Sequence, residues 1–404
     1  MKKFIFFLII IFSLFISFGN QPVNAQWQQC AGVTGIIHDF TSSGTNILVS
    51  TAPYGVWLST NNGGSWTHTP LNDKSVWSLD ASGSYVFAGT DLYGVYHSTD
   101  NGQSWTQTSL DSAEVYSLAI SGNNIFAGTS YIPPNTGGVY LSTDNGQNWN
   151  QIGVNNRFVL SLAISGSNVF SGTDSYGIYR STNNGQNWAQ TSLSNQTVLS
   201  LAIIGNSIFA GTWHGVWLST DNGVNWTQTT LNDKYVSSLT VSGNNIFAGC
   251  AYDEGVYLSK DNGQNWIEKN QGFSSIPSVA ALLTTNDYIF AGSGNGYIWR
   301  RSLQEITGIQ NVSNEIPSTF SLSQNYPNPF NPNTKIRFSI PTSGNITLKI
   351  YDILGREVKT LLSEFKSTGT YEVAFIGSGL ASGVYFYQLK AGDFIQTKKM
   401  LLLK

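Results

Sequence analysis

The most frequently repeated acidic residue in this chain lies in an eight-residue segment that reads STDNGQNW at Ser142–Trp149. An aspartate followed by Asn-Gly in a tight loop could act as a catalytic carboxylate or as a calcium ligand, and both roles require its charge. The copies of this segment carry Asp in four cases and Asn in two: Asp100, Asp144, Asp221, Asp261, Asn61 and Asn183. A turn needs only an acceptor oxygen, which Asp and Asn share, so we interpret this position as structural.

A second set of carboxylates lies in other predicted loops and provides four weak catalytic candidates: Asp91, Asp174, Asp253 and Glu254. A glycosidase needs two such groups about 5 to 10 Å apart. Asp91 and Asp174 occupy equivalent places in a repeated pattern, which indicates inheritance from the repeat. Glycoside hydrolysis is therefore the alternative interpretation, and binding without catalysis is favoured.

The histidines and cysteines predict neither a nucleophilic triad nor a metal site. His38, His68 and His97 fall on predicted strands, and only His214 falls in a loop. Cys30 and Cys250 are too few for a disulfide framework, so we interpret them as unpaired core residues, with a single bridge as the alternative. No cofactor or metal is expected.

The candidate residues belong to a repeat with a period near 40. The six copies of the segment start at Ser59, Ser98, Ser142, Ser181, Ser219 and Ser259. Each unit also contains short stretches with the alternation of β-strands, which in the third unit are Val115–Ser121, Asn124–Thr129, Gly138–Ser142 and Trp149–Ile152. Four strands in about 40 residues are typical of a β-propeller blade.

The number of blades follows from the strand that reads GVYLS in the third unit. It starts at Gly55, Gly94, Gly138, Gly177, Gly215 and Gly255, with a degenerate seventh copy at Gly296. The seventh unit lacks a fourth strand. Trp27 precedes His38 by the same eleven residues that separate Trp66 from Trp77. We therefore predict seven blades, with Trp27–Cys30 as the outer strand of the last one, which removes an exposed sheet edge.

The repeated segment resembles the Asp-box, or BNR, repeat S-x-D-x-G-x-x-W of sialidases, xyloglucanase-type glycosidases and photosystem II assembly factor propellers. The resemblance covers Gln26 to about Leu303 and implies the fold but not the activity. A sialidase-like site needs an arginine cluster, and its usual FRIP-type segment is absent here. The predicted propeller has four arginines: Arg157, Arg180, Arg300 and Arg301.

In a propeller of this kind the Asp-box loops lie on one face, and the opposite face usually holds the ligand. Six loops predicted on that opposite face carry an aromatic residue, and one also carries His214: Tyr54, Tyr93, Tyr131, Tyr176, Trp213 and Tyr252. Exposed rings suit a glycan or an extended polypeptide. We expect a non-catalytic glycan- or protein-binding module, with a scaffold or assembly role as a further alternative. The rings could also pack between blades.

The C-terminal region resembles the sorting domain of the type IX secretion system. The resemblance rests on YPNPFNP (Tyr326–Pro332), YDILGREV (Tyr351–Val358), GVYFYQL (Gly383–Leu389) and a lysine-rich last strand. It implies a partner, the outer-membrane translocon, and a secreted or surface location. The motif residues are Tyr326, Pro327, Asn328, Pro329, Phe330, Gly383, Tyr385, Lys398 and Lys399. Short alternating strands predict a small Ig-like β-sandwich there, so the fold class is all-β.

The N-terminus and the charge distribution complete the domain prediction. Lys2 and Lys3 precede an apolar run from Phe4 to Phe18, which is typical of a signal peptide. We predict a signal peptide (1–25), a propeller (26–303), a linker (304–319) and a sorting domain (320–404). The propeller and linker carry eight Lys or Arg and eighteen Asp or Glu, and the sorting domain ten and five. The net charge of −3 does not indicate nucleic-acid binding, and no later segment suits a membrane span.

Overall fold

The computed structural model describes residues 26–30, 32–130, 137–307, 309–313, 317–366, 368–377 and 380–403. The predicted signal peptide and Tyr131 lie outside these ranges. Within them, the strands form nine four-stranded sheets. The one helix in this part of the chain is α1 (Leu303–Thr307), and no described helix is long and apolar enough to span a membrane.

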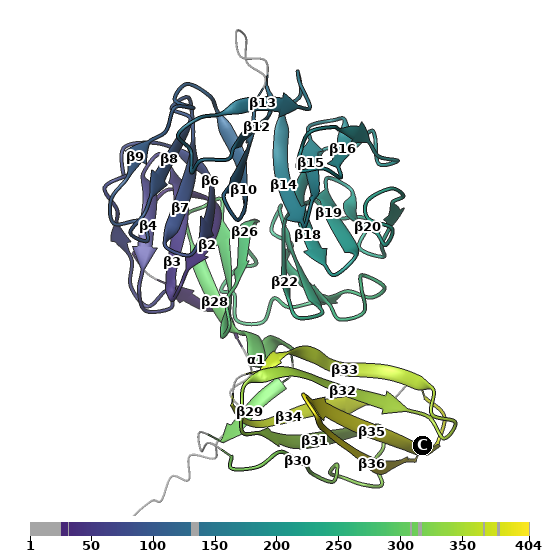
Figure 1. Cartoon of the computed structure of the whole chain (residues 1–404). Coiled ribbons are helices and arrows are strands. Elements are labelled where there is room, and N and C mark those ends of the chain that lie inside the picture. The colour runs from purple at the N-terminus through teal and green to yellow at the C-terminus, as the bar shows by residue number, and fades with distance from the viewer. Residues whose placement is uncertain are drawn as a thin grey trace, which may run out of the picture.

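Seven of the sheets form a ring (Figure 1), as the period near 40 predicts. The inner strands are β2 (Ile36–Ser43), β6 (Val76–Ser82), β10 (Val115–Ser121), β14 (Val159–Ser165), β18 (Val198–Ile204), β22 (Val236–Ser242) and β26 (Val279–Thr284). The second strands are β3 (Asn46–Ala52), β7 (Tyr85–Thr90), β11 (Asn124–Thr129), β15 (Asn168–Thr173), β19 (Ser207–Thr212), β23 (Asn245–Cys250) and β27 (Tyr288–Ser293).

The two outer strands of each blade are shorter. The third strands are β4 (Gly55–Ser59), β8 (Val95–Ser98), β12 (Gly138–Ser142), β16 (Gly177–Ser181), β20 (Gly215–Ser219), β24 (Gly255–Ser259) and β28 (Ile298–Ser302). The fourth strands are β5 (Thr67–His68), β9 (Thr106–Gln107), β13 (Asn150–Gly153), β17 (Ala189–Gln190), β21 (Thr227–Gln228), β25 (Ile267–Glu268) and, in the last blade, β1 (Gln28–Cys30).

The ring closes through its N-terminus, as predicted. Strand β1 pairs with β28 in antiparallel register, with Gln28 opposite Arg300. Trp27 is 3% exposed, stacks on Phe273 at 4.8 Å and donates a hydrogen bond from Nε1 to the carbonyl oxygen of Lys269 at 2.6 Å. The prediction that the first residues complete blade seven is therefore confirmed.

The Asp-box loops form a regular set of hydrogen bonds. In blade three, Ser142 Oγ donates to Asp144 Oδ1 at 2.8 Å, and the backbone N–H of Asn148 donates to the same oxygen at 2.9 Å. In blade four, Asn183 Oδ1 accepts a bond from the N–H of Asn187 at the same distance of 2.9 Å. Asp and Asn thus serve equally as acceptors in this turn.

The glycine of each box lies against the preceding blade. Gly223 has a φ of +79°, and a Cβ placed on it would lie 2.5 Å from the ring of Phe170 in blade four. Phe170 is fully buried between neighbouring sheets, as are its counterparts in the other blades, which are Leu48 in blade one and five phenylalanines: Phe87, Phe126, Phe209, Phe247 and Phe290. The box therefore fixes its own turn and also seals the core between two blades.

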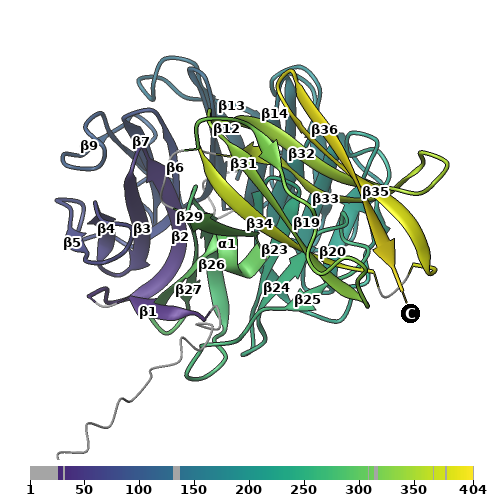
Figure 2. The same ribbon diagram turned by 90° about the horizontal axis from the view of Figure 1, so that it is seen from below.

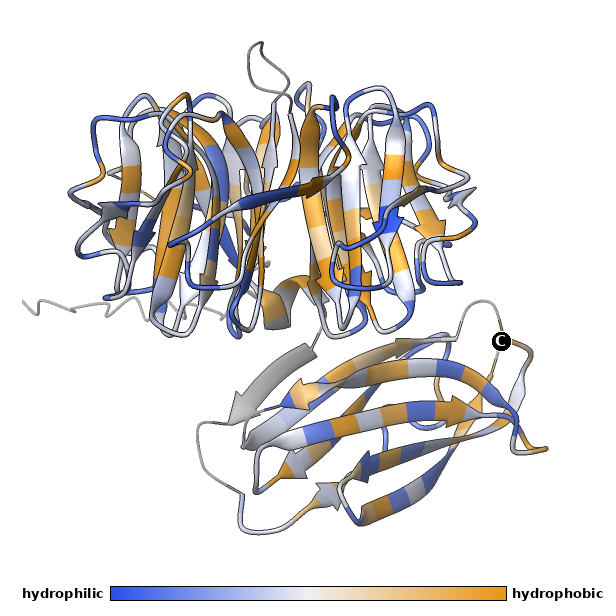
Figure 3. Cartoon of the chain, turned by 45° about the horizontal axis from the view of Figure 1, so that its top comes forward, coloured by the Kyte–Doolittle hydropathy of each residue, from blue (hydrophilic) through white to orange (hydrophobic). Residues whose placement is uncertain are grey.

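Two further sheets form the predicted C-terminal sandwich, which lies below the propeller in Figures 1 and 3. One sheet has the order β29-β34-β31-β30 and the other β33-β32-β35-β36. Their strands are β29 (Ile309–Ser313), β30 (Ser321–Leu322), β31 (Asn333–Ile340), β32 (Gly344–Tyr351), β33 (Glu357–Lys366), β34 (Gly369–Ile376), β35 (Gly383–Ala391) and β36 (Phe394–Leu402). Phe338, Leu348, Tyr387 and Met400 are fully buried between the sheets.

The segment predicted as a linker, 304–319, contains regular structure. Helix α1 packs on the propeller, where Leu303 and Ile306 share a core with Trp27, and Figure 2 shows α1 beside blade seven. Strand β29 instead pairs with β34 of the sandwich, with Ile309 opposite Val373. We propose that the boundary between the two domains lies between α1 and β29.

We name the two faces of the propeller by their loops. The box face carries the Asp-box loops and the turns between first and second strands, and the open face carries the remaining loops. Helix α1 lies at the box face, because the N–H of Leu303 donates to the carbonyl of Asp287 at 2.8 Å and Lys260 Nζ donates to that of Thr307 at 2.5 Å. The sandwich follows α1, so the open face is turned away from it (Figure 3).

Cys30 and Cys250 are both free. Desolvation by burial raises the pKa of the Cys30 thiol to about 11 and that of Cys250 to about 12. Both thiols are therefore protonated and unreactive near neutral pH. Their interpretation as unpaired core residues is confirmed.

Replacing Trp27 with alanine should destabilise the propeller by about 3 to 5 kcal/mol, because it leaves a cavity at the closing strand and removes the bond to Lys269. Urea denaturation of the mature chain followed by tryptophan fluorescence measures this change. Gln29→Ala is the matched control, since Gln29 lies exposed on the same strand. A Trp27→Ala protein as stable as this control would contradict the proposed role of the closing strand.

Candidate functional site

Five of the six predicted ligand-face aromatics are described, and all five are exposed on the open face. Their exposed fractions range from 46% for Tyr54 and Tyr176 to 75% for Tyr252, and Tyr93 and Trp213 lie between. His214 is exposed beside Trp213. These rings do not pack between blades, where side chains in this propeller are buried.

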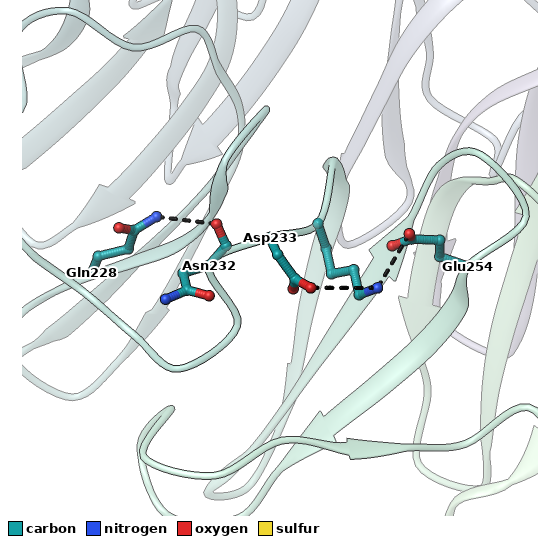
Figure 4. Close-up of polar contacts among 5 residues, drawn as sticks. Gln228, Asn232, Asp233 and Glu254 are labelled. Carbon is teal, nitrogen blue, oxygen red and sulfur yellow. Dashed lines mark hydrogen bonds and ion pairs between the residues drawn. The ribbon is translucent and has the colours of Figure 1, made fainter.

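The aromatic loops are held by glutamine side chains that sequence reasoning did not single out. Gln228 Nε2 donates to the carbonyl of His214 at 2.6 Å and to that of Asn232 at 3.4 Å, the second of which is drawn in Figure 4. Gln107 and Gln190 bind the carbonyls of Tyr93 and Tyr176 in the same way, at 2.9 and 2.7 Å. In these three blades, the glutamine of the outer strand thus links the aromatic loop to the connection that leads to the next blade.

In blades one, two and four, the glycine that follows the aromatic residue brings the loop close to that connection. Gly94 follows Tyr93 with a φ of +64°, and a Cβ on it would lie 1.8 Å from the carbonyl oxygen of Leu110. The same carbonyl accepts a hydrogen bond from the N–H of Val95 at 2.8 Å. No residue with a side chain fits there, so the ring is the first side chain that can project from the loop.

A cluster of three aromatic rings lies on blades five and six. Trp213 stacks on Tyr235 with ring centroids 6.1 Å apart, and Tyr252 meets Tyr235 edge-on at 5.3 Å. Lys234 Nζ, next to this cluster, lies 3.2 Å from Glu254 Oε1 and 3.8 Å from Asp233 Oδ2 (Figure 4). The cluster therefore combines a rigid apolar platform with a bordering set of charges.

Two other tyrosines on the open face each carry a cation over the ring. Lys74 Nζ lies 4.4 Å from the ring centre of Tyr93, and the guanidinium of Arg157 lies 3.9 Å from that of Tyr176. One side of each of these rings is therefore covered. Trp213 and Tyr252 have no such cation in the described chain, which makes blades five and six the better platform.

The four weak catalytic candidates are not brought together by any hydrogen bond within the described residues. Glu254 is held by Lys234, and Asp174 Oδ1 accepts hydrogen bonds from Thr197 Oγ1 at 2.9 Å and from Ser175 Oγ at 3.1 Å. Asp91 lies on blade two, and Asp253 is exposed on blade six. The described residues also contain no group of three His, Cys, Asp or Glu that suits a metal ion.

Several exposed apolar residues of the open face were not predicted. Tyr297 is 52% exposed in blade seven, and Leu92 and Ile276 are also exposed. Tyr297 occupies the strand position that glycine holds in the other blades. It therefore lies one residue beyond the loop and was not included among the predicted loop aromatics. Tyr235 was missed because it lies in the connection between two blades.

The channel at the centre of the ring is lined by aromatic residues near the open face. His38, Trp77 and Tyr116 stack on one another with centroid distances of 4.1 and 4.9 Å, beside a cavity of about 320 Å³. Desolvation lowers the pKa of His38 to about 4, so its imidazole is neutral at physiological pH. His38, His68 and His97 all lie on strands, as predicted.

Two buried carboxylates of the channel wall were also missed. Asp39 Oδ2 accepts a hydrogen bond from the N–H of Leu79 in the next blade at 2.9 Å, and Asp80 Oδ2 accepts one from Ile120 at 2.8 Å. Desolvation raises the pKa of Asp39 to about 7 and that of Asp80 to about 6. Each carboxylate ties one blade to the next, at a cost in solvation when it is charged.

The predicted sorting-motif residues bracket the last strand of the sandwich. Asn328 Oδ1 accepts a hydrogen bond from the N–H of Leu401 at 2.9 Å, and the N–H of Phe330 donates to the carbonyl of Leu401 at 3.0 Å. Tyr326 is 80% exposed, whereas Phe330 and Tyr385 are buried. Gly383 begins β35, and Lys398 and Lys399 lie on β36. Pro327 and Pro329 complete the segment between Tyr326 and Phe330.

Residues 324–403 match the family of secretion system C-terminal sorting domains. The chain is therefore exported by the type IX secretion system, to the cell surface or to the medium. A comparison with the sequences of curated proteins finds no match.

Solved structures similar to this chain are propellers. They include YCF48 bound to D1 peptide (17% identity, TM-score 0.57, covering 68% of this chain and 96% of that one) and an ancestral GH74 enzyme (16%, 0.53, 93% and 63%). Virginiamycin B lyase from Staphylococcus aureus is similar as well (11%, 0.57, 69% and 98%). At these identities the likeness shows the fold alone.

The raised pKa of Asp39 predicts how stability depends on pH. The folded chain binds the proton of the Asp39 carboxyl more tightly than the unfolded chain does. The stability that this proton contributes is therefore fully present below about pH 4 and is lost as the pH rises to about 7. Asp39→Asn should therefore reduce the fall in the free energy of unfolding between pH 4 and 7. Urea titrations at several pH values measure it, with Asp111→Asn, an exposed site, as the control. An unchanged slope in Asp39→Asn would refute the assignment.

Proposed function

Starting from an exported propeller with a sorting domain on its box face, we propose that the open face binds a glycan or a protein without catalysing a reaction. The observation that carries this proposal is the cluster of Trp213, Tyr235 and Tyr252 on blades five and six. Two of its rings are largely exposed on the face turned away from the sorting domain.

The cluster has the physical properties of a binding platform. Exposed apolar rings that sit together lose unfavourable contact with water when a ligand covers them, and their flat faces suit sugar rings or an extended peptide. Tyr235 contacts both Trp213 and Tyr252, so their positions are largely set before binding. Preorganisation lowers the entropy lost on association.

Binding without catalysis is supported by the use of the nearby carboxylates. Glu254 forms an ion pair with Lys234, and Asp174 accepts hydrogen bonds from two hydroxyl groups. Neither is placed as a free acid and base pair across a sugar. The GH74 enzyme and the peptide-bound YCF48 share this fold, and they indicate a glycosidase and a protein-binding scaffold as the competing functions.

A screen of the mature protein against polysaccharides, glycans and surface proteins, with hydrolysis assayed in parallel, tests the proposal. Trp213→Ala and Tyr252→Ala should each weaken the binding of any neutral glycan or protein ligand at least tenfold, as expected for the loss of a central aromatic contact. No hydrolysis product should appear.

The matched control is Tyr85→Ala, because Tyr85 is also exposed but begins a second strand on the box face. This variant should bind like the unchanged protein. A neutral glycan or protein ligand whose binding survives both open-face substitutions would refute the proposed site, and product formation that depends on Glu254 or Asp174 would establish the glycosidase instead.

A further inference from the structure

A groove of about 480 Å³ lies between blades four and five, far along the blades from the central channel. Arg180, Trp188, Thr191 and Val224 line it. It is bordered by the Asp-box loops of these two blades, so it is separate from the aromatic cluster of the open face. The sequence of the groove departs from the repeat at four positions.

The first departure is Arg180 on β16. The equivalent residue is leucine in four blades, Leu58, Leu141, Leu218 and Leu258. In blade seven it is Arg300, which donates to the carbonyl of Asn62 and covers the ring of Tyr288 at 5.1 Å. Arg180 has no hydrogen bond or ion pair with any described residue, and its Nε is buried without a partner. A half-buried guanidinium is thus left uncompensated in an acidic domain.

The second departure removes a carboxylate from the adjacent box. In boxes with aspartate, the side-chain N–H of the following asparagine donates to the second carboxylate oxygen, as Asn225 does to Asp221 Oδ2 at 2.8 Å. Box four has Asn183, whose side chain offers an N–H group there instead. The side chain of Asn187, which lines the groove, consequently has no hydrogen bond to any described residue. Box four is therefore less negative than the boxes with aspartate, and the side-chain amide of Asn187 is available to a ligand.

The other two departures shape the groove. Ala189 pairs with Arg180, where the other blades have Thr67, Thr106, Asn150, Thr227 or Ile267. Val224 replaces the glutamine found in four boxes and is 48% exposed. A small residue on one wall opens space, and the other wall carries the exposed apolar side chain of Val224.

We propose that this groove binds a carboxylated sugar residue, such as a uronic acid of an acidic polysaccharide. The guanidinium of Arg180 matches the two oxygens of a carboxylate, and its charge is not used by any described acid. Asn187 and Thr191, whose Oγ1 is buried without a partner, suit the hydroxyl groups of a sugar. Val224, which is 48% exposed, offers apolar contact to the ring carbons. A peptide with acidic side chains would leave these neutral polar groups unmatched.

Isothermal titration calorimetry of the mature protein with galacturonic acid oligomers tests the proposal, with neutral galactose oligomers of equal length as the comparison. Only the acidic oligomers should bind, and Arg180→Leu should weaken them at least tenfold. This variant installs the residue of four other blades, so it should fold, and thermal melting verifies that. Asn183→Asp, which restores a carboxylate and recaptures Asn187, should also weaken binding several-fold.

Trp213→Ala separates this site from the open face and should leave binding of the acidic oligomers unchanged. Equal affinity of the unchanged protein and a folded Arg180→Leu protein would overturn the proposal, as would the absence of any binding of the acidic oligomers. Tighter, Arg180-dependent binding of a glutamate-rich peptide would overturn the assignment to a sugar.

Discussion

The contact between each Asp-box glycine and a side chain of the preceding blade is the constraint on which this propeller depends. Gly223 on Phe170 is one example, and the ring of sheets is a chain of such contacts closed by Trp27. The box turn must therefore keep its shape in every blade. This shape depends on the acceptor oxygen of the Asp or Asn, on residues with left-handed backbone and on the glycine. It does not depend on the charge of the aspartate.

Because the box face carries this packing and also the sorting domain, variation is concentrated elsewhere. The loops of the open face differ in length and in charge, those of six blades present an exposed ring in the described residues, and blades five and six gather three rings into one platform. The rim between blades four and five differs in another way, because an uncompensated arginine replaces a core leucine. Function is thus best sought where a blade departs from the repeat and the departure has no structural partner.

Much of this architecture could be predicted from the sequence, because a repeat multiplies every signal. The seven blades, the closing strand before Cys30 and the sandwich all follow from spacing and alternation. The roles of Tyr235, Asp39 and Gln228 could not be predicted from the sequence. Each residue makes its contact at a boundary between blades, and the spacing of the repeat does not show which residues meet there. Nor did the sequence indicate that 304–319 would divide between a helix on the propeller and a strand of the sandwich.

The central claim is that the exposed rings of the open face, opposite the Asp-box turns, recognise the ligand of the proposed function. Hydroxyl-radical footprinting of the mature protein, alone and with the tightest neutral glycan or protein ligand found by screening, tests it most directly because it reports the exposure of each aromatic side chain. The account predicts that Trp213 and Tyr252 become protected while Tyr85 stays reactive. Protection of Tyr85 and of the box loops, with Trp213 and Tyr252 unchanged, would contradict it.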